Sequence, residues 1–365
     1  MVIPDSGKDL APPGRIPLLI LGFASLILGI LGGLWRLGWE PPLPGTQPAT
    51  FHGALMAAAF FGTVIGLERA VAFARLPAYA APLLTGLGGV ATAFGAPHLI
   101  SASLLCAGSA ALAVVTYLFH RRHPAPFMLV LLVGALCGVG GAALWLAGLP
   151  ANDVMAAWAG FLVLTIAGER LELSRLRRPS PNALKLLAAA TTLYLIGAAA
   201  LPLHWRIGTG ITGAAMVALA LWLGANDIAF RNLRHHGLMR FTAICLVGGY
   251  VWLGIGGLLL PFADTGGLIY DAALHAVFLG FVFAMVFGHA PVIFPAILRV
   301  QIPFTSLFYL HVGLLNATLA LRVAADLLDW SQGRAWGGMG NATALFLFLL
   351  MTAAGVIRGR RGETA

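Results

Sequence analysis

Long, continuous apolar runs separated by short polar segments are the feature that most restricts how this chain can fold. A helix needs about 20 predominantly apolar residues to cross the hydrocarbon core of a bilayer. A transmembrane barrel would instead show segments of about 10 residues in which polar and apolar side chains alternate. The pattern therefore predicts an all-α integral membrane protein with one polytopic membrane domain over residues 1–365.

Composition agrees with this class. Hydrophobic residues make up 59% of the chain, charged residues only 10%, and the mean hydropathy is +0.90. Soluble domains carry about 25% charged residues, so a soluble fold could not bury this much apolar surface. Three cysteines, Cys106, Cys137 and Cys245, stand singly in apolar runs, which predicts neither disulfides nor a thiolate metal site.

Charges, prolines and glycines bound the apolar runs, which predict a bundle of about twelve transmembrane helices. The first run lacks a small-residue cleavage site, so we expect it to be retained as a span. The predicted spans cover residues 16–35, 51–73, 78–96, 98–119, 126–148, 152–173, 183–202, 205–224, 238–260, 268–295, 303–324 and 340–357.

The basic residues divide unequally between the two sides of such a bundle. If the N-terminus is cytoplasmic, four of the 22 Lys and Arg residues lie outside and the other 18 inside; the four are Arg36, Arg206, Arg322 and Arg334. Cytoplasmic loops collect Lys and Arg. We therefore expect both termini in the cytoplasm and a multi-pass protein of a bacterial inner (plasma) membrane, with the lipid bilayer as its partner. The net charge of +9 follows from this topology, and no nucleic-acid partner is predicted.

Two histidines are predicted near the outer face. His52 opens the second span, and His275 lies about two turns inside the outer end of the tenth. Asp271 precedes His275 by four residues, where its carboxylate could accept the imidazole N–H and leave the other ring nitrogen as a ligand. The alternative for both histidines is an interfacial side chain, with Asp271 as a helix cap.

Two further histidines are predicted at greater depth. His289 follows His275 by fourteen residues, which on a regular helix places it about 21 Å deeper and about 40° around the axis. Pro291 and Pro295 follow it, which suggests a kink or a break in this span. His311, on the eleventh span, shares a face with Thr318 and Arg322, and this stripe should point into the bundle. A ligand role and a packing role both stay open for these two histidines.

A weak internal repeat relates residues 52–70 to residues 153–171. The segments share Phe, Ile, Glu and Arg at an offset of 101 residues, and each ends in an acid–base pair, Glu68-Arg69 and Glu169-Arg170. One interpretation is a proton-relay carboxylate. The other is an inter-helix salt bridge, with Glu68 paired to Arg170 and Arg69 to Glu169.

The chain resembles the NnrS family, membrane proteins associated with haem and copper and with nitric oxide stress, which are similar to haem-copper oxidase subunit I. The resemblance rests on the twelve-span plan, the Pro/Gly-rich segment 41–45 before His52, Ala273-Leu274-His275-Ala276, Gly288-His289 and segment 250–253. It implies haem, and copper, held by His52, His275 and His289 with Asp271 and His311 nearby. It also implies a small gaseous ligand. This sequence has His52-Gly53 where the family has His-x-His-Glu.

Three functions remain open at this level. The first is an NnrS-like haem protein, or a haem-copper protein of that kind, which takes part in redox or nitric-oxide-related chemistry. Its axial ligands would be His52 and His275. The second is a proton-coupled secondary transporter of a small solute, for which the repeat, the Glu-Arg pairs and the tenth span argue. The third is a cofactor-free assembly subunit of a membrane complex. No motif of a hydrolase or kinase is recognisable, and the sequence does not decide whether the protein is an enzyme.

Overall fold

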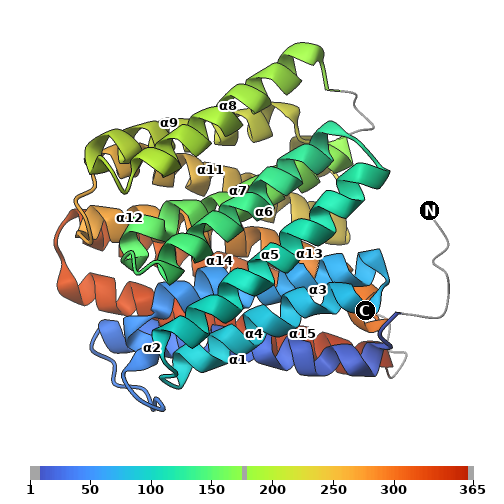
Figure 1. The fold of residues 1–365 in the computed structure, drawn as a ribbon, viewed down its shortest axis with the longest axis horizontal. Coiled ribbons are helices and arrows are strands. Elements are labelled where there is room, and N and C mark those ends of the chain that lie inside the picture. Colours follow the sequence, from blue (N-terminus) through green and yellow to red (C-terminus); the bar gives the residue numbers. More distant parts are fainter. Residues whose placement is uncertain (1–8, 175–178, 361–365) are drawn as a thin grey trace. The chain divides into compact units, whose positions relative to one another are not determined.

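The computed structural model describes residues 9–174 and 179–360, and within these ranges the chain forms helices and loops and no strand (Figure 1). Contacts divide it into two compact units: Met1–Thr165 with Ile297–Arg299, and Ile166–Ala296 with Val300–Ala365. The first unit holds α1 (Pro12–Arg36), α2 (Gln47–Thr50), η1 (Ala54–Phe60), α3 (Phe61–Phe73), η2 (Leu76–Tyr79), α4 (Ala80–Ala93), α5 (His98–Arg122), α6 (Pro126–Leu146) and the first part of α7 (Ala151–Leu173).

The second unit holds the remaining helices. These are the end of α7, α8 (Pro181–Ala200), α9 (Trp205–Asn226), α10 (Ala229–Asn232), α11 (Gly237–Leu259), η4 (Leu260–Phe262), α12 (Leu268–His275), η5 (Ala276–Phe283), α13 (Ala284–Leu298), α14 (Phe308–Leu327) and α15 (Ser331–Arg360). Among helices that are neighbours in sequence, α8 packs against α9 and α14 against α15, while α11 contacts α9, η5 and α12.

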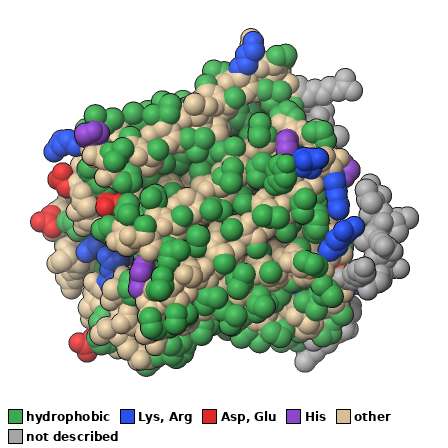
Figure 2. All heavy atoms as spheres, in the orientation of Figure 1, with side chains coloured by type: hydrophobic (Ala, Val, Ile, Leu, Met, Phe, Trp, Pro, Cys, Tyr) green, Lys and Arg blue, Asp and Glu red, His purple; other side chains and the backbone are tan. Residues whose placement is uncertain are grey.

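Eleven helices of the described chain, of 20 to 31 residues, are long and apolar enough to cross a membrane. This confirms the predicted class of helical bundle. Many of the large side chains exposed on these helices are hydrophobic, including Leu99, Leu136, Leu186, Leu221 and Leu350. On the face shown in Figure 2, hydrophobic side chains cover the middle of the helices and charged side chains lie toward their ends. A surface of this kind is compatible with a surrounding of lipid.

The predicted third span, residues 78–96, differs from the other eleven. It is formed by the 3-10 turn η2 and by α4, which has only 14 residues. At 1.5 Å per residue α4 is about 21 Å long, shorter than the hydrocarbon core of about 30 Å. Hydropathy alone could not show this, because Pro77 and the residues around it are apolar although they form a turn.

Two π-helical segments interrupt the α-helical pattern. One is η1, which begins two residues after His52, and the other is η5, which begins directly after His275. π-helices are rare and occur often at functional sites. Because a π turn contains more residues than an α turn, the angle of about 40° predicted between His275 and His289 does not apply. Of the kink or break predicted after His289, the break is not found, because α13 continues through Pro291 and Pro295 to Leu298, and the kink stays a prediction.

Glycines allow close helix crossings. A Cβ at Gly62 would lie 3.1 Å from the Thr85 side chain, and a Cβ at Gly134 would lie 3.1 Å from the backbone nitrogen of Thr165. In the second unit, a Cβ at Gly337 on α15 would lie 2.8 Å from the Cα of Arg322 on α14. The α14–α15 hairpin therefore depends on a glycine at the level of Arg322.

The first described residues are held against the first unit. Arg15 pairs with Asp9 through a 2.8 Å contact, and the Tyr79 hydroxyl donates to Asp9 at 2.7 Å. These two contacts keep the segment before α1 in place.

The crossing at Gly337 can be tested by one added methyl group. Gly337→Ala should lower the stability of the protein by about 1–3 kcal/mol, because the methyl group meets the backbone of α14. Gly313→Ala, on α14, is the matched control: nothing lies within 4 Å of its Cβ position, so no loss is expected. Thermal unfolding in detergent measures both. Equal stabilities of the two variants would contradict the close approach.

Candidate functional site

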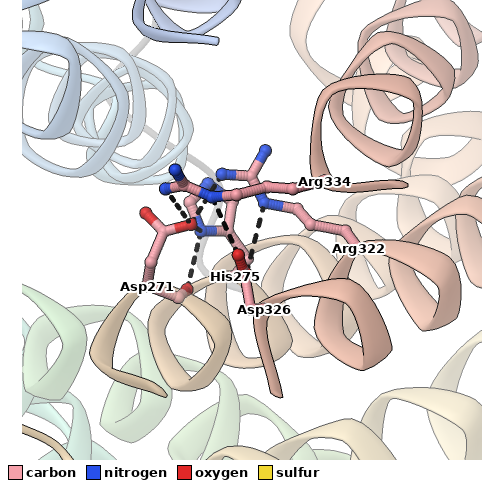
Figure 3. Close-up of polar contacts among 5 residues, drawn as sticks. All are labelled: Asp271, His275, Arg322, Asp326 and Arg334. Atoms are coloured by element: carbon pink, nitrogen blue, oxygen red, sulfur yellow. Dashed lines mark hydrogen bonds and ion pairs between the residues drawn. The ribbon is translucent and has the colours of Figure 1, made fainter. Parts of the chain in front are cut away.

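The Asp271 carboxylate joins three helices of the second unit (Figure 3). Arg322 on α14 donates to Asp271 Oδ2 at 2.7 Å, and Arg334 on α15 lies 3.3 Å from the same oxygen. The side chains of Asp271 and Arg322 are 18% and 7% exposed. Hydrogen-bonded ion pairs in so little water restrict the geometry of both partners. The cluster of Asp271, His275, Arg322, Asp326 and Arg334 is called the outer cluster below, after the side on which the sequence places it.

Asp326 completes the charge balance of the outer cluster. Its side chain is fully buried and makes ion-pair contacts with Arg334 Nε at 2.8 Å and with Arg322 Nε at 4.0 Å. Two carboxylates thus face two guanidinium groups, so the four charges sum to zero. Asp326 and Arg334 were not predicted as site residues. The spacing of Arg322 and Asp326, four residues apart on one helix, was the signal that could have indicated this pair.

His275 is held in one tautomer by the backbone of its own helix. Its Nδ1 lies 2.8 Å from the carbonyl oxygen of Asp271 and 3.4 Å from the Asp271 carboxylate. A carbonyl oxygen can only accept, so Nδ1 carries the proton, and in the neutral ring Nε2 then has the lone pair. Metal-binding histidines use this arrangement. The predicted role of Asp271 is served by its carbonyl group, while its carboxylate mainly binds the arginines.

His52, in the first unit, has the same local chemistry. Its Nδ1 lies 2.6 Å from the carbonyl oxygen of Gly29 on α1, so Nε2 again has the lone pair. The imidazole lies against Gly33, where a Cβ would approach the ring carbon Cε1 to 2.9 Å. Gly29 supplies the carbonyl group and Gly33 the room that the His52 imidazole needs.

His289 belongs to a second group of charged residues. Its Nδ1 donates to the carbonyl of Met285 at 2.8 Å, and its Nε2 lies 3.2 Å from Arg170 NH1, which must donate to it. Arg170 is also bonded to Asp227 through Nε and, at 3.0 Å, through NH2. The Nε2 lone pair of His289 therefore accepts a hydrogen bond from a guanidinium group, which does not favour His289 as a metal ligand.

The acid–base pairs of the repeat have different outcomes. Arg170 has its carboxylate partner in Asp227, which follows α9 and was not predicted. Asp227 is the one acidic residue between Glu172 and Asp264, so a search for a partner in that region would have found it. Pairing of Glu68 with Arg170 and of Arg69 with Glu169 stays a prediction. The repeat does not extend to local structure, since residues 54–60 form a π-helix and α7 is an α-helix throughout.

His311 lies in an aromatic environment. It is 2% exposed, and the Phe287 ring stands perpendicular to the imidazole with centroids 4.6 Å apart, with Phe348 next to both. Its Nδ1 is 3.4 Å from Met351 Sδ, and its Nε2 has no hydrogen bond within the described residues. The predicted inward stripe is confirmed: His311 and Arg322 are buried, and Thr318 bonds to Asn341 at 2.8 Å.

Fold and clusters together define an all-helical protein, compatible with a multi-pass membrane bundle, that carries ionisable groups in its interior. Residues 15–357 match a family described as "Domain of unknown function (DUF8744)", and the chain belongs to this family. No curated protein matches the sequence. Within residues 9–174 and 179–360, no group of three or more His, Cys, Asp or Glu side chains is arranged to hold a metal ion.

The role of Asp271 in joining helices predicts a large effect of neutralising it. Asp271→Asn leaves Arg322 and Arg334 with only Asp326 as counter-charge, so the stability should fall by about 3 kcal/mol. Asp264→Asn is the control, because Asp264 and Arg206 form an ion pair 3.7 Å long with side chains 84% and 86% exposed. Exposed pairs contribute little. Thermal unfolding that ranks the two variants equally would contradict this role.

Proposed function

We propose that the protein is a membrane haem protein in which His275 and His52 each serve as a ligand of haem iron. The observation that carries the proposal is the shared tautomer: each Nδ1–H is bonded to a backbone carbonyl, so the lone pair lies on Nε2, as in metal-binding histidines. A π-helical segment begins two residues after His52 and another directly after His275. Haem supplies its own four nitrogen donors, so one or two protein imidazoles suffice and no protein cluster of three ligands is needed.

A bound haem would supply electron transfer or the binding of a small gaseous ligand. The resemblance to the NnrS family favours redox or nitric-oxide-related chemistry. The chain's own part is to orient each imidazole and, at His275, to limit contact with water, since that side chain is only 18% exposed. The tautomers of His52 and His275 support haem binding only. The copper site predicted at His52, His275 and His289 stays a prediction. The His289 Nε2 accepts a hydrogen bond from Arg170, which does not favour His289 as a copper ligand.

A second candidate, a proton-coupled transporter, is favoured by one observation. Arg170 and Asp227 form a buried ion pair beside His289, and ionisable groups inside membrane helices often mark ion or proton pathways. Under this alternative, no histidine substitution changes an absorption spectrum, and substitutions of Glu68 and Glu169 damage function most. The haem measurement below therefore separates the two candidates.

Haem content is expected to depend on two of the ten histidines. His275→Ala and His52→Ala should each lose bound haem or its normal spectrum, because each removes the imidazole Nε2 proposed to bind the iron. Asp271→Asn should be milder, with a loss of about 10–100-fold in haem affinity, since the carbonyl bond to His275 persists. Visible absorption and haem quantification of the full-length protein from haem-replete cells measure these effects.

The controls for this experiment are His289→Ala and His204→Ala. The former removes a histidine bonded to Arg170 and the latter a histidine that precedes α9. Both variants should retain haem. A fully loaded, spectrally unchanged His275→Ala protein would refute the ligand assignment, and a wild-type protein without a Soret band would refute the haem proposal itself.

The proposal includes a location, a bacterial inner membrane with both termini in the cytoplasm, which requires the short helix α4 to cross together with the eleven longer helices. Support comes from the 18 basic residues that this orientation places inside against four outside. Reporter fusions after Arg122 should be active in the cytoplasm, and fusions after Pro44 and Asp264 should be active outside. One reversed loop would contradict the orientation, whatever the cofactor content.

A further inference from the structure

The connection between α9 and α11, in the second unit, carries exposed basic side chains that the haem proposal does not use. It comprises residues 228–240, with α10 and the first turn of α11, and is called the basic turn below. No acidic residue occurs between Asp227 and Asp264. The exposed basic side chains of the basic turn are Arg231, Arg234, His235, His236 and Arg240.

The three arginines of the basic turn differ from the buried arginines in their partners. Arg322, for example, donates to the Asp271 carboxylate at 2.7 Å. Within residues 9–174 and 179–360, no ion pair or side-chain hydrogen bond is formed by Arg231, Arg234 or Arg240. Their positive charge is therefore not compensated by the described part of the fold, and an anion from outside the chain can bind there.

The backbone of the basic turn is fixed by hydrogen bonds. Asp227 Oδ1 accepts from the backbone N–H of Ala229 at 2.7 Å, and the backbone N–H of Arg234 donates to the carbonyl of Arg231 at 3.3 Å. The short helix α10 also packs against α11, whose first turn carries Arg240. A surface with an ordered backbone loses less conformational entropy when it binds a ligand.

Two exposed apolar side chains stand next to these arginines. Phe230 is 48% exposed and directly precedes Arg231, and Met239 is 54% exposed and directly precedes Arg240. Apolar side chains at the boundary between headgroups and acyl chains stabilise binding to a membrane, and basic side chains beside them reach the headgroups. This pattern fits a phospholipid better than a soluble anion, which offers no apolar surface.

The basic turn also lies at the level where headgroups are found. It joins α9, which ends at Asn226, to α11, which begins at Gly237, and both helices are long and apolar enough to cross a membrane. Trp222 Nε1, near the end of α9, donates to the carbonyl of Ala183 at 2.7 Å, so the start of α8 with the exposed Lys185 lies at the same end. Clusters of about four to eight Lys and Arg residues next to a membrane helix attract anionic lipids.

We propose that the basic turn is a binding site for an anionic phospholipid. Arg231, Arg234 and Arg240 donate to the phosphate oxygens of the headgroup, and Phe230 and Met239 lie against the acyl chains. No covalent bond forms or breaks. The inference rests on the proposed location in a membrane and is independent of the proposed haem.

Lipid binding by the full-length protein tests this site. Protein in detergent is mixed with dioleoylphosphatidylglycerol or with dioleoylphosphatidylcholine, which share their acyl chains but differ in headgroup charge, and native mass spectrometry counts the bound lipids. We expect the wild-type protein to prefer phosphatidylglycerol. Arg231→Gln, Arg234→Gln and Arg240→Gln combined should lower this preference about tenfold or more. All three side chains are exposed, so the fold should persist, which thermal unfolding verifies.

The matched control removes three exposed arginines of the first unit, by Arg75→Gln, Arg121→Gln and Arg122→Gln combined. The net charge falls by the same amount, but Arg121 is bonded to the Tyr117 hydroxyl at 3.2 Å and Arg122 Cζ lies 4.8 Å from the Phe73 ring centroid. This variant should keep the preference. Equal losses in both variants would show that net charge alone attracts the lipid and would overturn the site, as would an unchanged preference in the variant of the basic turn.

Two further measurements distinguish a lipid from a soluble phosphate. Glycerol phosphate has the charged group without acyl chains and should not displace phosphatidylglycerol at equal concentration. Phe230→Gln and Met239→Gln combined keep the arginines and should weaken phosphatidylglycerol binding. Displacement by glycerol phosphate, or unchanged binding by this apolar variant, would refute the lipid as occupant.

The result is independent of the haem measurement. A haem-free protein that prefers phosphatidylglycerol through the basic turn supports this site and counts only against the haem proposal. A haem-loaded protein without that preference refutes this site and leaves the haem proposal standing.

Discussion

A single carboxylate, that of Asp271, fixes the arrangement on which the proposed haem ligand depends. Burying a charge without a partner in apolar surroundings costs free energy. The packing of α12, α14 and α15 therefore requires ion pairs of Asp271 with Arg322 and Arg334. The same residue offers its backbone carbonyl to His275. The orientation of the imidazole is thus a consequence of a helix that is itself held by ion pairs, and Gly337 lets α15 come close enough to take part.

Histidine chemistry in the two units follows one rule with different partners. His52 and His275 both donate Nδ1–H to a carbonyl, His52 to a neighbouring helix and His275 to its own. His289 does the same, yet its Nε2 meets a guanidinium group. The guanidinium group of Arg170 at Nε2 therefore argues against His289 as a metal ligand. Its depth along the span does not decide this.

The sequence predicted the class of fold well, because hydropathy and helix length are local properties. Each of the twelve apolar runs corresponds to a helical segment, and only the third is too short, since the turn around Pro77 is as apolar as a helix. The site was predicted in part. His52, His275 and Asp271 could be chosen from spacing, but Asp227, Asp326 and Arg334 are brought in by contacts between helices. The two π-helical segments were not predicted, because the angles between residues along a span were calculated for a regular α-helix.

The most direct test of the account is the ligand set of the iron itself. Magnetic circular dichroism of the oxidised, full-length protein from haem-replete cells reports the atoms bound to haem iron. Our account predicts a haem with imidazole nitrogen ligation, whose signature is lost in His275→Ala and kept in His289→Ala. A protein without haem, or a haem whose imidazole signature is unchanged by His275→Ala, would contradict it.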